Sequence, residues 1–247
     1  MTNRKAIVTG SASGIGAATV LALAAQGYDT VGIDCHLAGA LATSQAASAL
    51  GGKHHALLAD VADEPQLVAA MAQAVQFLGA LDALATCAGV TESSAFMELS
   101  AKEFRATYDI NVIGTFVAIR EAAKHMQSGG RICTVASVAG LRGGGLLGTA
   151  AYAASKGAVL ALSKNAARSL GSLGISVNCI APGATHTPMI AAVWENEALR
   201  QKVESMAVQN RTAEPREIAA NIAYLLSPQA SYVTGATLVA DGGLTMY

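Results

Sequence analysis

Tyr152 and Lys156, four residues apart, are the pair in this sequence whose types and spacing point most directly to chemistry. In a helix, residues four apart lie on one face, so the Lys156 ammonium would lie beside the Tyr152 hydroxyl. A neighbouring cation favours an ionised phenol, and lowering its pKa from about 10 to about 7 requires roughly 4 kcal/mol. We therefore predict that Tyr152 exchanges protons near neutral pH, while the nearby Ser137 hydroxyl holds a carbonyl or alcohol oxygen. The same spacing also arises by coincidence on surface helices, so the surrounding elements must decide.

A glycine-rich turn follows the first predicted strand, residues 6–8, and precedes an apolar helical pattern over 17–26. Gly10 permits a tight turn, Gly14 lets backbone amides approach a pyrophosphate, and Gly16 allows the helix to pack closely on the strand. A preceding strand and a following helix are the context that this motif requires. The residues predicted to bind the phosphates of a dinucleotide are Gly10, Ser13, Gly14, Ile15 and Gly16.

A second predicted strand, 29–34, ends on the carboxylate of Asp34. A carboxylate there can accept the two ribose hydroxyls of an adenosine and would repel a 2′-phosphate. The glycine-rich turn holds no Lys or Arg, and His36 is the nearest group after Asp34 that could be cationic. The sequence therefore favours NAD over NADP. The alternative is that Asp34 is simply a polar strand end.

Strands and helices alternate along the rest of the chain. Further strands are predicted at 55–59, 81–86, 131–136, 175–180 and 236–239, and helices at 38–50, 65–77, 101–126, around Tyr152 and at 215–226. Residues 138–151 read as a loop and 188–211 as a mobile connection. Such alternation predicts an α/β fold: one Rossmann-type domain over 1–247, with a doubly wound parallel sheet of about seven strands and helices on both faces. Ligands bind such sheets beyond the carboxyl ends of the strands.

Several polar or small residues follow these strand ends. Asp60, with Val61, could meet an adenine amino group or could equally cap the helix near Asp63. The bend Cys87, Ala88 and Gly89 would let cofactor backbone pass close by. A turn at Pro182 and Gly183 leads to Thr185 and Thr187, whose hydroxyls could bind a carboxamide.

Asn111 lies inside a predicted helix, where asparagine is a poor helix former. It is predicted either to hold a water beside Lys156 or to be a satisfied structural amide. The predicted substrate lining is apolar and suggests a small to medium ligand: Val138, Leu141, Leu146, Leu147, Met189, Val193 and Trp194. Arg142 could receive an anionic group or remain a solvated loop cation.

Composition excludes several classes of protein. The 247 residues carry a net charge of −1 and only 13% charged residues, so no basic surface for nucleic acid is indicated. No apolar run of about 18 residues predicts a membrane span, and the apolar segment after Lys5 is too short for a signal peptide. We expect a cytoplasmic protein with four reduced cysteines and no metal.

With these residues in place, the sequence resembles the short-chain dehydrogenase/reductase family nearly from end to end. The matching motifs, in order, are Thr9-Gly10-x-x-x-Gly14-Ile15-Gly16, Asn111, Ser137, Tyr152-x-x-x-Lys156, Pro182-Gly183 and Asp241-Gly242-Gly243. The resemblance implies Tyr152 as acid/base, Ser137 orienting the substrate oxygen, Lys156 binding the nicotinamide ribose, and Asn111 completing a proton relay. It also implies a homotetramer, often assembled through the helices of Asn111 and Tyr152.

Two departures from the family pattern stand out. Thr86-Cys87-Ala88-Gly89 replaces the usual Asn-Asn-Ala-Gly, and the connection from Ser137 to Tyr152 is about two residues longer than usual. The predicted function is hydride transfer between nicotinamide C4 and a small to medium secondary alcohol or ketone, with NAD as cofactor. The alternatives are a 3-oxoacyl-thioester reductase using NADPH, and a non-catalytic dinucleotide-binding sensor.

Overall fold

The computed structural model describes residues 3–92, 94–144 and 149–246, and its centre is a parallel sheet. The seven strands are hydrogen-bonded in the order β3-β2-β1-β4-β5-β6-β7, so strand order reverses between β1 and β4. Their bounds are β1 Arg4–Thr9, β2 Tyr28–Asp34, β3 His54–Leu58, β4 Leu81–Thr86, β5 Met126–Val135, β6 Ser176–Pro182 and β7 Thr237–Ala240. This confirms the predicted doubly wound α/β architecture.

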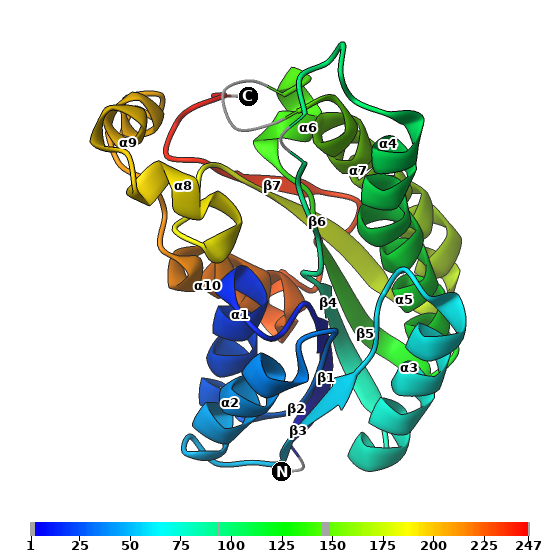
Figure 1. Ribbon diagram of the computed structural model, residues 1–247. Helices are drawn as coiled ribbons and strands as arrows, with labels where there is room; N and C mark the ends of the chain where they lie inside the picture. The colour runs from blue at the N-terminus through cyan, green and yellow to red at the C-terminus, as the bar shows by residue number, and fades with distance from the viewer. Residues whose placement is uncertain (1–2, 93, 145–148, 247) are drawn as a thin grey trace.

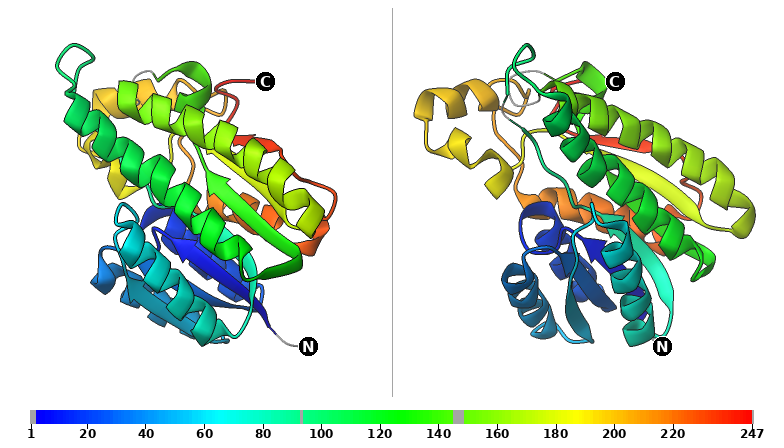
Figure 2. Two further views of the ribbon diagram at one scale, coloured as in Figure 1. Left: turned by 90° about the vertical axis from the view of Figure 1, so that its right-hand side faces the viewer. Right: turned by 45° about the vertical axis from the view of Figure 1, so that its right-hand side comes forward.

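Helices cover both faces of the sheet (Figure 1). One face carries α1 (Gly14–Ala25), α2 (Leu37–Ser48) and α10 (Pro215–Leu226), and the other carries α3 (Glu64–Leu78), α4 (Ala101–Tyr108), α5 (Gly114–Ala123) and α7 (Ala150–Leu170). Two views in Figure 2 show α4, α5 and α7 running side by side as an outer layer.

Two apolar cores result from the alternation of side chains along each strand. Ile7 and Leu84 point to the face of α3 and α5, whereas Ala6, Val8 and Ala85 point to the face of α1 and α10. Both sets are fully buried. Because both faces of every central strand are covered, the strands read as continuous apolar runs, which is what allowed their prediction.

Four predicted segments differ from the structure. The strand predicted at 131–136 begins five residues earlier, since β5 covers Met126–Val135. The helix predicted over 101–126 ends at Ala123 and is interrupted by a π-helical turn, Asp109–Ile113. The predicted loop 138–151 begins with a short helix, α6 (Val138–Arg142), which Ser137 caps at its start and a left-handed Gly143 ends. The connection 188–211 contains a 3₁₀ turn, Pro188–Ile190, and the helices α8 (Ala191–Trp194) and α9 (Glu197–Glu204).

Candidate active site

A cavity of about 910 Å³ lies beyond the carboxyl ends of the strands. All the residues predicted to bind a dinucleotide line it, from Gly10 in the first turn to Thr187 after β6. Figure 1 shows α6, α8 and α9 at this end of the sheet. The cavity therefore occupies the position at which doubly wound sheets bind their ligands.

The glycine-rich turn fits a pyrophosphate because it has no room for side chains. A Cβ at Gly10, where φ is +71°, would lie 2.5 Å from the Ala88 nitrogen, and one at Gly16 would lie 1.9 Å from the Gly10 oxygen. No side-chain cap covers the first amides of α1, whose N-cap is Ser13. Free amides at the start of a 12-residue helix suit an anionic phosphate group.

Asp34 is fixed in place at the end of β2. Its carboxylate oxygens accept hydrogen bonds from the backbone amides of Ala12, at 2.9 Å, and His36, at 2.8 Å. The carboxylate thereby ties the glycine-rich turn to the end of the neighbouring strand. Each oxygen keeps further lone pairs for hydroxyl donors, so the side chain fits the ribose-binding role predicted for it.

Ser137, Tyr152 and Lys156 converge on the same cavity from two different elements. Ser137 follows β5, and its Oγ accepts a hydrogen bond from the Ala139 amide at 3.1 Å. Lys156 is buried on α7, where its Nζ donates to the Val135 oxygen at 2.8 Å. Its Nζ lies 5.8 Å from the centre of the Tyr152 ring. The two side chains thus share one face of α7, as predicted.

The electrostatics of this group differ from the prediction. Burial raises the pKa of Tyr152 above 10, with the Ser137 hydroxyl acting in the opposite direction, and Lys156 does not lower it. Burial also lowers the pKa of Lys156 itself, from 10.5 to about 8. This direction is opposite to the acidified phenol that the spacing predicts, because burial disfavours the charged phenolate.

Asn111 lies at the centre of the π-helical turn and does not line the cavity. Its Oδ1 accepts from the Val90 amide at 2.9 Å, and its Nδ2 donates to the Val90 oxygen and the Ser155 Oγ, both at 2.9 Å. These contacts match the structural alternative stated for this amide. A Cβ on Gly89 would lie 3.2 Å from Asn111 Oδ1 and 3.3 Å from Lys156 Nζ, so Gly89 is close to both side chains. The relay role of Asn111 remains a prediction.

Asp60 lines the cavity and does not cap a helix. Its Oδ1 accepts from the Ala62 amide at 2.9 Å, which closes a turn. The cap of α3 is Asp63, which accepts from the Gln66 amide at 3.0 Å. Of the two interpretations of Asp60, the helix cap was thus wrong, because the cap position falls three residues later in the chain.

The substrate side of the cavity includes only part of the predicted lining. Val138, Met189 and Arg142 line it. Trp194 does not, because it packs on His186 with ring centres 4.1 Å apart. Of the four other predicted residues, Leu141 packs against a small buried cluster, Val193 is buried and does not line the cavity, and Leu146 and Leu147 lie outside the described residues. The cluster that Leu141 contacts consists of Ala136, Val159, Leu160 and Cys179.

Sequence reasoning missed the wall formed by residues 203–213 and 239–244. The amide of Gln209 donates to the Gly242 oxygen at 3.1 Å, which joins the two segments. Arg211 and Glu217 form an ion pair at 2.7 Å on this wall. Only the Asp241-Gly242-Gly243 turn gave a signal, since it was seen as a family motif but not as cavity lining.

Among the described residues there is no group of three or more His, Cys, Asp or Glu side chains that could hold a metal ion. All four cysteines are free thiols. None of the described helices has the length and apolar character needed to span a membrane.

Comparisons with known proteins agree over nearly the whole chain. A family profile described as Enoyl-(Acyl carrier protein) reductase matches residues 10–245. The 2,5-dichloro-2,5-cyclohexadiene-1,4-diol dehydrogenase of Sphingobium indicum is 37% identical, over 99% of this chain and 98% of its own. The 3-oxoacyl-(acyl-carrier-protein) reductase FabG of Staphylococcus aureus is 34% identical, over 98% of each chain. A solved short chain dehydrogenase from Burkholderia cenocepacia in complex with NADP is 33% identical over 98% of this chain and 97% of its own, with a TM-score of 0.92.

Proposed function

Since the chain belongs to the short-chain dehydrogenase/reductase family, we propose that it is an NAD-dependent oxidoreductase that interconverts a secondary alcohol and a ketone of small to medium size. One observation carries the proposal: Ser137, Tyr152 and Lys156 line the same cavity as the glycine-rich turn and Asp34. A binding protein without turnover would have no need for a hydroxyl, a phenol and a buried amine in that position.

The bound dinucleotide would supply the hydride acceptor or donor, held by the glycine-rich turn, Asp34 and Lys156. Ser137 would hold the substrate oxygen. In ketone reduction, the neutral Tyr152 phenol donates its proton to the carbonyl oxygen as hydride reaches the carbon. In alcohol oxidation, the Tyr152 phenolate removes the hydroxyl proton as hydride leaves. The raised pKa of Tyr152 favours its proton-donor form.

The small apolar substrate is supported by the apolar part of the cavity lining. Val90, Val138, Met189, Ile190 and Leu244 line the cavity. These side chains offer contact area without hydrogen-bond partners, so a carbinol flanked by hydrocarbon groups suits them better than a polyol.

Tyr152→Phe tests the proposed chemistry. This change removes the proton donor and leaves the cofactor residues intact, so we expect turnover to fall by at least about 10²-fold while NADH still binds. Absorbance at the NADH band measures turnover with a panel of alcohols and ketones, and Tyr224→Phe on an exposed tyrosine is the matched control. Near-normal activity of Tyr152→Phe would exclude the assignment.

Asp34 supports NAD over NADP. Asp34→Asn removes the charge and keeps one carbonyl acceptor, so the preference for NADH over NADPH, measured as a ratio of kcat/KM values, should fall at least about tenfold. A preference of the unmodified chain for NADPH would contradict the choice of NAD.

A second candidate is a 3-oxoacyl-thioester reductase using NADPH. The likeness to FabG of Staphylococcus aureus favours it, whereas the carboxylate of Asp34 disfavours it. Assays with acyl thioesters and both reduced cofactors separate the two candidates. Faster turnover of thioesters with NADPH would select the second.

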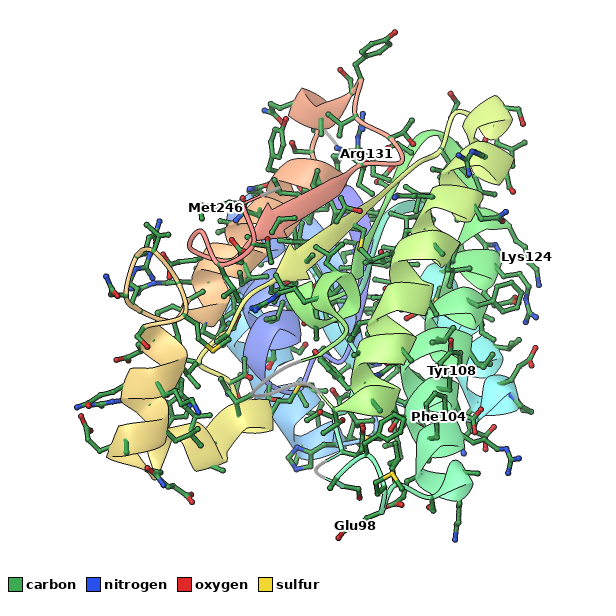
Figure 3. All side chains as sticks on the ribbon, turned by 90° about the horizontal axis from the view of Figure 1, so that it is seen from above. Glu98, Phe104, Tyr108, Lys124, Arg131 and Met246 are labelled. Atoms are coloured by element: carbon green, nitrogen blue, oxygen red, sulfur yellow. The ribbon has the colours of Figure 1, made fainter. Side chains whose placement is uncertain are left out.

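We also propose a homotetramer, with the layer of α4, α5 and α7 as one interface. Ile113 and Phe116 are each 43% exposed on this layer. Phe104 and Tyr108, both half-buried and labelled in Figure 3, stack along α4 with ring centres 5.8 Å apart. Light scattering measures the mass, and a monomer at assay concentration would contradict the proposal.

A further inference from the structure

Residues 89–92, here called the strap, follow β4 in the connection to α4. Hydrogen bonds hold the strap on both sides. On one side, the Asn111 amide pairs with both the N–H and the C=O of Val90, each at 2.9 Å. On the other side, Glu92 Oε1 accepts from the Ala151 amide at 3.1 Å and from the Thr149 hydroxyl. The strap therefore links the π-helical turn to the start of α7, and its residues Gly89 and Thr91 line the cavity between them.

Glu92 takes the place of a local helix cap. Thr149 occupies the N-cap position of α7 but makes no side-chain cap. The capping oxygen comes from Glu92, which accepts a hydrogen bond from the Ala151 amide, 59 residues later in the chain. A carboxylate at a helix start also suits the helix dipole. Because α7 begins at Ala150, Tyr152 is its third residue. The Glu92 contact thus acts on the turn that carries the phenol.

We propose that Glu92 is a positioning residue, which fixes the first turn of α7 and holds the Tyr152 phenol in register with Ser137. This inference rests on the proposed function, since it concerns the same phenol. Ser137 lies between β5 and α6, and Tyr152 lies on α7, so their relative position depends on how the start of α7 is anchored. A phenol displaced by about 1 Å can cost on the order of 10²-fold in rate.

This role requires a side chain long enough to accept a hydrogen bond from the Ala151 amide, and it does not require a charge. Glu92 Oε2 is buried and makes no hydrogen bond to the described part of the chain. Glu92→Gln would place an amide nitrogen there and keep an acceptor for Ala151, so it preserves the anchor without the charge. Glu92→Asp keeps the charge, but its side chain is one methylene shorter and falls short of the amide.

The experiment measures kcat, KM and the Kd for NADH of Glu92→Gln, Glu92→Asp and Glu92→Ala. We expect Gln to retain kcat within about threefold, and Asp and Ala to lower it at least about tenfold, with the Kd for NADH within about twofold throughout. The matched control is Glu103→Ala. Glu103 also caps a helix, accepting from the Ser100 amide at 2.9 Å, but its helix α4 carries no proposed catalytic group. Glu103→Ala should lower the stability of the protein and leave kcat unchanged.

Two results would overturn the inference: a Glu92→Ala variant with kcat within about twofold of the parent, or an active Asp variant beside an inactive Gln variant. The second result would assign the effect to charge. If Glu92→Ala fails to fold, the Gln and Asp pair decides alone. Tyr152→Phe is measured in parallel. If that variant keeps its activity, the proposed function fails; if it is inactive and the Glu92 variants behave like Glu103→Ala, only the positioning role fails.

Discussion

Replacing Lys156 with methionine should stabilise the fold at neutral pH and abolish turnover. Lys156 is only 4% exposed, and its burial lowers its pKa from 10.5 to about 8. The protein therefore holds a cation where burial disfavours charge. Methionine has a similar length and no charge, so Lys156→Met removes that unfavourable burial.

The magnitude follows from the two pKa values. The gap between 10.5 and about 8 corresponds to about 3 kcal/mol of destabilisation while the amine is protonated in the folded state. The variant also leaves the Val135 oxygen without its donor, which costs about 1 kcal/mol. The net gain near pH 7 is thus about 2 kcal/mol, or roughly 4–8 °C in Tm for a chain of this size.

The effect has a definite dependence on pH. Between pH 8 and 10.5 the unfolded chain keeps the Lys156 proton and the folded chain loses it, so the stability of the unmodified protein rises with pH in this window. The advantage of Lys156→Met should therefore shrink above pH 8 and reverse near pH 10. Thermal unfolding of both proteins from pH 6 to 10 measures it.

Lys164→Met is the matched control, because Lys164 is an exposed lysine on the same helix. It should change Tm little, and by the same amount at every pH. The reasoning fails if the difference in Tm between Lys156→Met and the parent is constant from pH 6 to 10, or if the variant is less stable at pH 7. Either result would mean that burial of the Lys156 cation does not destabilise the fold.

Two further predictions concern packing and thiol access. Gly140→Ala should lower kcat at least about tenfold, because its Cβ would lie 2.6 Å from the Gly157 nitrogen and from the Lys156 carbonyl carbon; Gly157→Ala, whose Cβ would lie 3.4 Å from the Gly140 oxygen, is the control that should keep its activity. Equal kcat values for the two would refute the steric argument. Cys35 and Cys87 both line the cavity, and burial raises the pKa of both thiols, that of Cys87 to about 12. Because Cys35 is the more exposed of the two, iodoacetamide at pH 9 should label it first, and NADH should slow that labelling. Mass spectrometry of the labelled peptides tests both expectations, and labelling of Cys87 first would contradict them.

Most of the fold could be read from the sequence because its signals are local. Strand β4 was predicted with the bounds that the structure gives, Leu81–Thr86, and helix α10 likewise, Pro215–Leu226. A run of buried apolar residues marks the first, and Pro at the first turn followed by amphipathic spacing marks the second. The placement of Asp34 and the glycine-rich turn at one cavity follows from the same logic, since parallel strands bring their carboxyl ends together.

The missed elements are short or dominated by charge. Helix α6 has five residues, too few to show a helical period. Helix α9 is rich in Glu, Lys and Arg, so it read as a mobile connection, although Asn196 gives a capping signal by accepting from the Leu199 amide at 3.0 Å. The position of Trp194 depends on its packing against His186. That contact arises in three dimensions and has no local signature.

The pKa values were beyond sequence reasoning for a related cause. Spacing places Lys156 beside Tyr152, but the depth of both is set by what packs on α7. Three close approaches bury Lys156: the Val135 oxygen accepts from its Nζ, Gly89 lies against that nitrogen, and Gly140 packs on its backbone. None of these neighbours is near Lys156 in the chain, so its desolvation appears only once the fold is known.

Close packing around Lys156 makes its protonated amine destabilising for the fold, and the same packing suits Lys156 to its proposed role. A lysine whose pKa is about 8 remains largely protonated at neutral pH, yet it is held by one carbonyl in a fixed position rather than by a carboxylate. A carboxylate partner would stabilise the cation and cancel the positive charge that a phenolate requires. The burial that lowers the pKa of Lys156 and the fixed position of its ammonium beside the Tyr152 ring thus have one origin. Lys156→Met removes the buried cation, so it should also remove the ammonium that is proposed to bind the nicotinamide ribose.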